Sequence, residues 1–178
     1  MLAKLKKYKT EKSDQGFTII EVMIVLAIAG LILLIVFLAV PALQRSARNT
    51  QRKNDAAAVD AAISNYISDN NGAVPDTLTY AGGVVTVSCT AGGYNGAACT
   101  VGTNSETAKV GIFTAATEDT AAAAGDKVTN DQTVELVPGW NCNSTNTGLG
   151  AKSPRSASVL FQLEAGNGAT NIDECQEQ

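Results

Sequence analysis

Hydrophobic and polar positions divide the chain into regions with different periodicities. Residues 1–16 are polar and lysine-rich, whereas in the apolar run of residues 17–43 only Thr18 and Glu21 are conventionally polar. About twenty apolar residues suffice to cross roughly 30 Å of hydrocarbon as a helix. The apolar run therefore predicts a membrane-spanning helix, with residues 1–16 as a leader outside it.

The apolar run is followed by an amphipathic pattern over residues 44–72. Apolar side chains recur there at helical spacing, at Ala56, Val59, Ile63, Tyr66 and Ile67. The charged side chains expected off this stripe are Arg48, Arg52, Asp55 and Asp69. Asn70-Asn71-Gly72 is typical of a helix C-terminus, and Pro75 prevents continuation shortly afterwards. The pattern predicts a second, amphipathic half of the same helix.

Residues 73–178 change to short β-rich runs between turn residues, which predicts a globular head. The expected strands are residues 78–80, 84–88, 108–114, 133–137 and 158–164, and residues 115–131 are expected as a surface loop or short helix. The apolar stripe is the obvious cover for such a sheet. The predicted fold class is α+β, a long N-terminal helix packed on a small antiparallel sheet.

Composition restricts the chemistry available to the head. The chain has no histidine, the commonest general acid or base and metal ligand. Five lysines and two acids precede Phe17, so the remainder holds 8 basic and 15 acidic side chains. This acidic balance argues against general nucleic-acid binding. No EF-hand loop, closely spaced cysteine pair or nucleophile-base pattern stands out. We therefore expect no enzyme, no cofactor and no metal.

The four cysteines, Cys89, Cys99, Cys142 and Cys175, all lie in the C-terminal portion. An even number beyond an apolar segment predicts two disulfides formed outside the cytoplasm. Three pairings are possible, of which Cys89–Cys99 and Cys142–Cys175 are favoured. Trp140 is expected as a partly buried anchor beside Cys142.

The flanking charges give a small orientation bias, because five lysines precede the apolar run and four basic residues follow it. Together with the disulfide expectation, this places the N-terminus in the cytoplasm and the C-terminus outside. An ordinary secretory signal peptide is disfavoured, since its apolar core would be shorter and would end at a small-residue cleavage site.

Glu21 is the one charged residue in the apolar run. It could lie at the membrane interface, serve an ion pathway, or pair with a cation from another subunit. Cleavage after Gly16 would remove the lysine leader and leave Phe17 with a free α-amine, which is cationic near neutral pH. That amine lies one helical turn from Glu21, which favours charge pairing within or between chains.

The sequence from Gly16 to Gly30, GFTIIEVMIVLAIAG, after a lysine-rich leader, resembles the N-terminal signature of type IV prepilins. The resemblance covers roughly residues 4–45. It implies cleavage between Gly16 and Phe17 by prepilin peptidase, N-methylation of Phe17, and docking of Glu21 with the Phe17 amine of a neighbouring subunit. It also implies the pilin lollipop fold, and Cys142 and Cys175 resemble the disulfide-bounded region of many pilins.

The resemblance further implies a homopolymer, a helical surface filament built by the pilus assembly machinery. The chain would be a single-pass protein of the cytoplasmic membrane before assembly. Leu38 stands where the family often has a helix-bending proline, so helix loosening during assembly is expected between Gly30 and Pro41. A major type IV pilin is the leading hypothesis, with adhesion, twitching motility and DNA uptake left open as uses.

Two alternatives stay open at this point. Within the same superfamily, the chain could be a type II secretion pseudopilin or a minor pilin. From another class, it could be a single-span membrane-anchored extracellular binding protein that never polymerises. Asn143-Ser144-Thr145 also fits the glycosylation sequon, and its occupancy is open.

Overall fold

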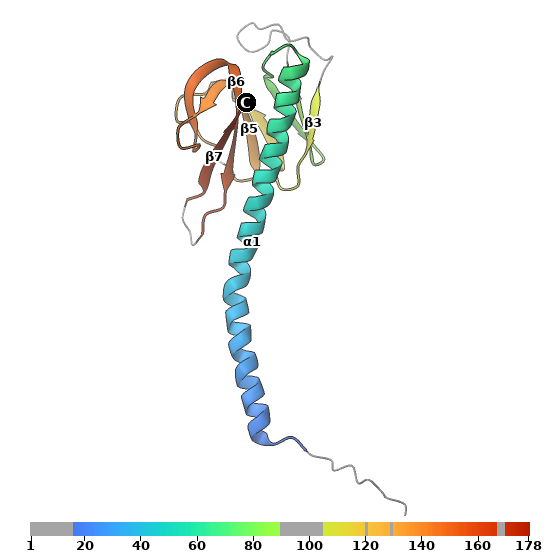
Figure 1. Cartoon of the computed structure of the whole chain (residues 1–178), viewed down its shortest axis with the longest axis vertical. Coiled ribbons are helices and arrows are strands. Elements are labelled where there is room, and N and C mark those ends of the chain that lie inside the picture. The colour runs from blue at the N-terminus through green and yellow to red at the C-terminus, as the bar shows by residue number, and fades with distance from the viewer. Residues whose placement is uncertain (1–15, 90–104, 120, 129, 167–169) are drawn as a thin grey trace, which may run out of the picture. The chain divides into compact units, whose positions relative to one another are not determined.

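The computed structural model has an α+β fold and describes residues 16–89, 105–119, 121–128, 130–166 and 170–178. Contacts divide the chain into two units, Met1–Pro41 and Ala42–Gln178. Helix α1 (Ile19–Asp69) continues from the first unit into the second (Figure 1). The strands among the described residues are β1 (Thr77–Ala81), β2 (Val84–Ser88), β3 (Glu106–Lys109), β4 (Ala115–Glu118), β5 (Thr133–Cys142), β6 (Leu149–Leu163) and β7 (Ile172–Glu177).

Helix α1 ends where the sequence predicts a stop. Asn71 and Gly72 both adopt positive φ, at 56° and 85°, and the amide of Gly72 donates to the carbonyl of Ile67 at 2.8 Å. A left-handed residue after the last turn lets the chain reverse while satisfying carbonyls that the helix leaves unpaired. Glycine adopts this conformation at little steric cost.

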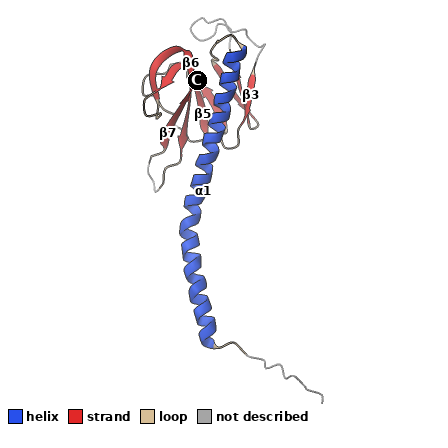
Figure 2. Cartoon of the chain, in the orientation of Figure 1, coloured by secondary structure: helices blue, strands red, loops and turns tan. Residues whose placement is uncertain are grey.

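The strands of the second unit form two sheets, which Figure 2 shows beside α1. The three-stranded sheet has the order β1-β2-β3 and is antiparallel throughout. The four-stranded sheet has the order β4-β5-β6-β7, in which β4 and β5 are parallel and the other pairs are antiparallel. The long helix packed on mainly antiparallel sheet is as predicted, and the strands divide between two sheets where one was expected.

The predicted apolar stripe of α1 forms the centre of the main core. Ala56, Val59, Ile63 and Tyr66 are each 0 % exposed. They belong to a cluster with buried side chains from both sheets, including Leu78, Val85, Val87, Val134, Leu136 and Phe161. Removing apolar surface from water contributes roughly 25 cal/mol per Å². Burial of this one helix face therefore holds the two sheets on α1.

Two charged residues that were expected outside the apolar stripe of α1 lie on the same helix face as the stripe and are buried there. Arg52 and Asp55 are each only 2 % exposed. Each stands four residues before a stripe residue, Ala56 and Val59 respectively, so helical geometry places it on the same face. The prediction was wrong because it relied on side-chain polarity, whereas the folded head supplies partners to Arg52 Nη2 and to the Asp55 carboxylate.

Several strand boundaries also differ from expectation. The strand expected over residues 108–114 ends at Lys109, because the Asp55 carboxylate accepts from the amides of Gly111 and Ile112 at 2.8 and 2.7 Å. Those amides cannot join a strand ladder. Within the expected 115–131 loop the chain forms β4, and β5 and β6 are longer than expected. Strand β7 was not predicted, because its sequence IDECQE is mostly polar, as suits a strand at a sheet edge.

Candidate functional site at the start of helix α1

Gly16 and Phe17 lie immediately before α1, outside regular structure. Apart from its chain neighbours, no described residue has an atom within 4 Å of the position that a Cβ would take at Gly16, and Phe17 is 88 % exposed. Side chains of the described residues thus leave the peptide bond between them open to approach. This geometry is compatible with the predicted cleavage, which stays a prediction.

Thr18 and Glu21 form a reciprocal pair at the first turn of α1. The Glu21 Oε2 atom accepts from the Thr18 amide at 2.9 Å and from the Thr18 hydroxyl at 2.7 Å, and the Glu21 amide donates to Thr18 Oγ1 at 3.3 Å. This arrangement is a capping box, which satisfies amides that the first helical turn leaves without partners. The sequence-based prediction omits Thr18, although the Thr-x-x-Glu spacing is the signature that identifies it.

The capping box uses only part of the hydrogen-bonding capacity of Glu21. Both donors of Thr18 reach Oε2, and Oε1 has no hydrogen bond from the residues that the structure describes. A carboxylate accepts at both oxygens. Glu21 is therefore held in one orientation while one oxygen stays available to a donor from outside the chain.

The first part of α1 exposes an apolar surface. The large apolar side chains of residues 17–43, which include Phe17 just before the helix, are between 39 % and 88 % exposed. Within the described part of the chain, α1 is the one helix long and apolar enough to cross a membrane. A continuous apolar surface of this length requires lipid or other apolar helices around it.

Gly30 and Pro41, the residues predicted to loosen the helix, both lie inside α1. Apart from its chain neighbours and the backbone of its own helix, no atom of the described residues lies within 4 Å of the position of a Cβ at Gly30. Pro41 has no amide hydrogen, so the bond to the carbonyl four residues earlier cannot form. Glycine also costs about 0.5–1 kcal/mol relative to alanine in a helix. Both positions weaken the helix locally, and loosening on assembly stays a prediction.

Of the three head cysteines that the structure describes, Cys89 and Cys175 are buried and Cys142 is partly buried. Cys142 and Cys175 form a disulfide that joins β5 to β7, the two neighbours of β6. Trp140 is 7 % exposed and packs in a second core cluster with Cys175 and Cys142, as expected for an anchor beside the bridge. Cys89 is buried and disulfide-bonded. Its predicted partner, Cys99, lies outside the described residues.

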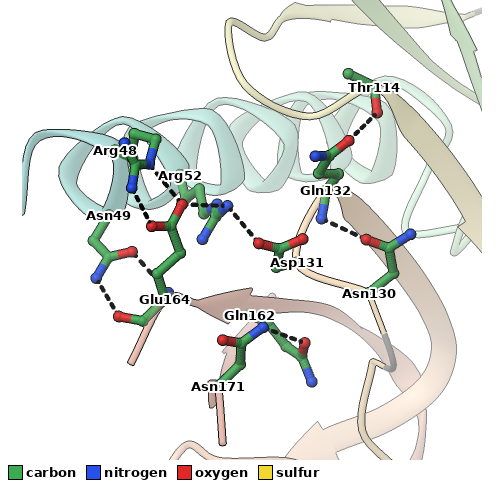
Figure 3. Close-up of polar contacts among 10 residues, drawn as sticks. All are labelled: Arg48, Asn49, Arg52, Thr114, Asn130, Asp131, Gln132, Gln162, Glu164 and Asn171. Atoms are coloured by element: carbon green, nitrogen blue, oxygen red, sulfur yellow. Dashed lines mark hydrogen bonds and ion pairs between the residues drawn. The ribbon is translucent and has the colours of Figure 1, made fainter. Parts of the chain in front are cut away.

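A second polar constellation surrounds Glu164, just after the end of β6, and is drawn in Figure 3. Arg48 Nε and Nη2 donate to its two carboxylate oxygens at 2.7 and 2.5 Å, and Arg52 Nη2 donates at 2.9 Å. The Asn49 side chain exchanges hydrogen bonds with the Glu164 backbone, at 3.0 and 2.8 Å. Arg52 also reaches Asp131 at 3.0 Å. Three residues of α1 thereby fasten the helix to the end of β6.

The electrostatics of this constellation favour the charged forms. The hydrogen bond from Arg48, together with the nearby charge of Arg52, lowers the pKa of Glu164, and the hydrogen bond to Glu164 raises the pKa of Arg48. These groups are engaged in ion pairs and are not poised to exchange protons near pH 7. Among the residues described, no group of three or more cysteine, aspartate or glutamate side chains could hold a metal ion. The constellation fastens α1 to the residue that follows β6.

Comparison with known proteins adds one finding at the N-terminus. Residues 12–37 match the family model of the prokaryotic N-terminal methylation motif. This motif is the class III signal peptide of type IV pilins, which confirms the resemblance read from the sequence. It indicates a prepilin of the type IV pilin-like or pseudopilin kind, a structural class of protein. No curated protein and no solved structure matches the chain.

Proposed function

We propose that the chain is the major structural subunit of a type IV pilus. Prepilin peptidase cuts between Gly16 and Phe17, and Phe17 is then N-methylated. The apolar part of α1 anchors the subunit in the cytoplasmic membrane with the N-terminus inside, and later packs with other copies in the core of a surface filament. The chain is not an enzyme, and its partners are the assembly machinery and further copies of itself.

The observation that carries this proposal is the orientation of Glu21. Its Oε2 atom is held by Thr18 at 2.9 and 2.7 Å, whereas Oε1 receives no hydrogen bond from the described residues. An unpaired carboxylate is costly in an apolar environment. The amine that cleavage creates at Phe17 of a neighbouring subunit is a cation of the right chemistry for Oε1. In a filament, each subunit has neighbours that can supply such an amine.

Two substitutions at one position test the proposal. Glu21→Gln keeps a side chain that can complete a capping box but removes the charge, and Glu21→Ala removes both. We expect both variants to insert in the membrane normally and to form few or no filaments in sheared surface preparations. Normal filament yield from Glu21→Gln would rule out charge pairing as the docking interaction.

Two further measurements separate the finer parts of the proposal. N-terminal mass spectrometry of the surface protein should find methylated Phe17 as the first residue, and an intact Met1 would disprove processing. Abundance discriminates the major subunit from a minor pilin or pseudopilin. The chain should dominate a sheared filament preparation, and a trace amount would assign it to one of those alternatives.

A further inference from the structure

The glycosylation sequon Asn143-Ser144-Thr145 is the one Asn-x-Ser/Thr sequence among the 178 residues of the chain. An asparagine in this sequence is the acceptor for N-linked glycans in exported proteins. The structure places the sequon in residues 143–148, which join β5, ending at Cys142, to β6, beginning at Leu149. The proposed function gives this motif no role.

The connection between β5 and β6 lies at the surface of the head. Ser144, Thr145 and Asn146 are exposed, and Asn143 is partly exposed. A glycosyl transferase must reach the asparagine of a sequon and the hydroxyl residue two positions later. Both residues lie on this surface connection, so the sequon of the folded head is open to approach.

Backbone hydrogen bonds hold this connection in one conformation. The Asn143 amide donates to the Gly148 carbonyl at 2.9 Å, and the Asn146 amide donates to the Asn143 carbonyl at 3.0 Å. The Cys175 amide donates to the Asn146 carbonyl at 2.8 Å, which ties the connection to β7. Asn143 is therefore presented by an ordered turn.

The two polar atoms of the Asn143 side chain serve this turn unequally. Oδ1 accepts from the Thr145 amide at 3.1 Å, from the Thr145 hydroxyl at 3.0 Å and from the Thr147 amide at 3.0 Å. Nδ2 donates to Thr147 Oγ1 at 3.4 Å, which is longer than most hydrogen bonds of this kind. An aspartate would supply the same acceptor oxygen. The turn therefore depends on the carbonyl oxygen far more than on the amide nitrogen.

We propose that Asn143 is a glycosylation site, modified at Nδ2 on the outer side of the membrane. The sugar donor is an oligosaccharide joined through a diphosphate to a polyprenyl lipid. A bond forms between Nδ2 and the anomeric carbon of the first sugar, as the bond from that carbon to the phosphate oxygen breaks. The lipid diphosphate leaves with the electron pair of the broken bond, and Nδ2 loses one proton to a base of the transferase.

The observed turn is compatible with the glycosylated product. The new bond replaces one hydrogen of Nδ2, and the amide keeps its second hydrogen. The carbonyl oxygen is not altered, so Oδ1 keeps its three hydrogen bonds to Thr145 and Thr147. The attached glycan is bulky and hydrophilic and covers the exposed connection between β5 and β6. The site rests on the proposed function only for the location of the head outside the cytoplasm.

Mass spectrometry of the protein purified from its native cells tests this assignment. After reduction of the disulfide, trypsin cuts after Lys127 and Lys152 and releases residues 128–152, which contain the sequon. We expect this peptide to carry added sugar mass, located on Asn143 by fragmentation that preserves the glycan. An unmodified peptide would overturn the proposal. Sugar on Ser144 or Thr145 would also overturn it and would indicate transfer to a hydroxyl group.

Two variants separate the acceptor nitrogen from the turn. Asn143→Asp keeps an acceptor oxygen but removes the nitrogen, so it should fold normally and lose the sugar completely. Thr147→Val is the matched control, because it removes the hydroxyl that accepts from Nδ2 but leaves the sequon intact, and it should keep the sugar. Sugar retained on Asn143→Asp would overturn Asn143 as the site. Circular dichroism of each variant would verify that the head is folded.

This test is independent of polymerisation, because trypsin digests the protein from membranes and from sheared filaments alike. Sugar on Asn143 of a chain that never forms filaments would support the glycosylation site and contradict the proposed function. Filaments built from a chain with unmodified Asn143 would support the proposed function and overturn the glycosylation site.

Discussion

Arg52 Nη2 donates to Glu164 Oε1 at 2.9 Å, joining the start of the amphipathic part of α1 to the end of β6, 112 residues later in the chain. The Arg52 side chain is 3 % exposed and that of Glu164 is 18 % exposed. Burying a guanidinium without its carboxylate is unfavourable, because the desolvation of the charge is not offset. This contact is therefore central to how the helix and the four-stranded sheet stay together.

Replacing Glu164 with glutamine should lower the free energy of unfolding by about 2–4 kcal/mol, because Arg52 would stay buried without a full counter-charge. Urea unfolding of the full chain in detergent micelles measures this loss. Glu118→Gln, at the exposed end of β4, is the matched control and should change stability by less than about 0.5 kcal/mol. Equal stability of Glu164→Gln and wild type would show that Asp131 alone compensates Arg52.

The ion pairs of Glu164 also predict how the free energy of unfolding depends on pH. Hydrogen bonding from Arg48, with the charge of Arg52, lowers the pKa of Glu164 below its ordinary value of 4.5. A carboxyl group with a lower pKa in the folded state binds more protons when unfolded. The contribution of Glu164 to the free energy of unfolding is therefore complete above about pH 4.5. It is lost as the pH falls through the pKa of Glu164 in the folded state.

Unfolding curves between pH 7 and pH 2.5 test this dependence. The stability difference between wild type and Glu164→Gln should be constant above about pH 5 and shrink at lower pH. Burial raises the pKa of Asp60 and of Glu135, which acts in the opposite direction. Both groups are present in the two proteins, so their effect cancels in the difference. A difference that stays constant to pH 2.5 would contradict the lowered pKa of Glu164.

Removing the Cys142–Cys175 disulfide should destabilise the head markedly. The bridge closes a loop with a sequence separation of 33, for which the chain-entropy model gives about 3.5 kcal/mol. The double substitution Cys142→Ala with Cys175→Ala should therefore lower Tm by about 10 °C, measured by thermal unfolding. A change of only 1–2 °C would indicate that the second core cluster around Trp140 holds β5 and β7 without the bridge.

Thr18→Val should loosen the first turn of α1, because the valine side chain cannot donate to Glu21 or accept from its amide. Loss of an N-cap costs about 1 kcal/mol, so exchange of the Glu21 amide in micelles should rise about fivefold by NMR. Thr18→Ser keeps the hydroxyl and should exchange like wild type. Fast exchange in both wild type and Thr18→Ser would contradict the capping box.

Local patterns in the sequence were sufficient for features that depend on near neighbours. The end of α1 follows from Asn71 and Gly72, which tolerate positive φ. The strand β2 follows from an apolar, β-branched run that suits a buried strand. The Thr18–Glu21 cap is also readable, since both partners lie within one helical turn.

Long-range contacts explain where the sequence was misleading. Arg52 and Asp55 were expected on the solvent side, yet the head supplies Glu164 to one and the Gly111 and Ile112 amides to the other. The polar strand β7 is recognisable only through its pairing with β6. The partners of Arg52 and Asp55 lie from 56 to 112 residues away along the chain, beyond the reach of periodicity.

By itself, the sequence determined the apolar anchor, the methylation motif at residues 12–37 and the amphipathic stripe that covers the sheets. Periodicity and local hydrogen bonding carry this information, because they act over one or two helical turns. Only the tertiary structure decided that there are two sheets, that buried charges fasten α1 to Glu164, and that Arg45 lies against Gly166. Those features arise when distant segments meet and must satisfy each other's charges and volume.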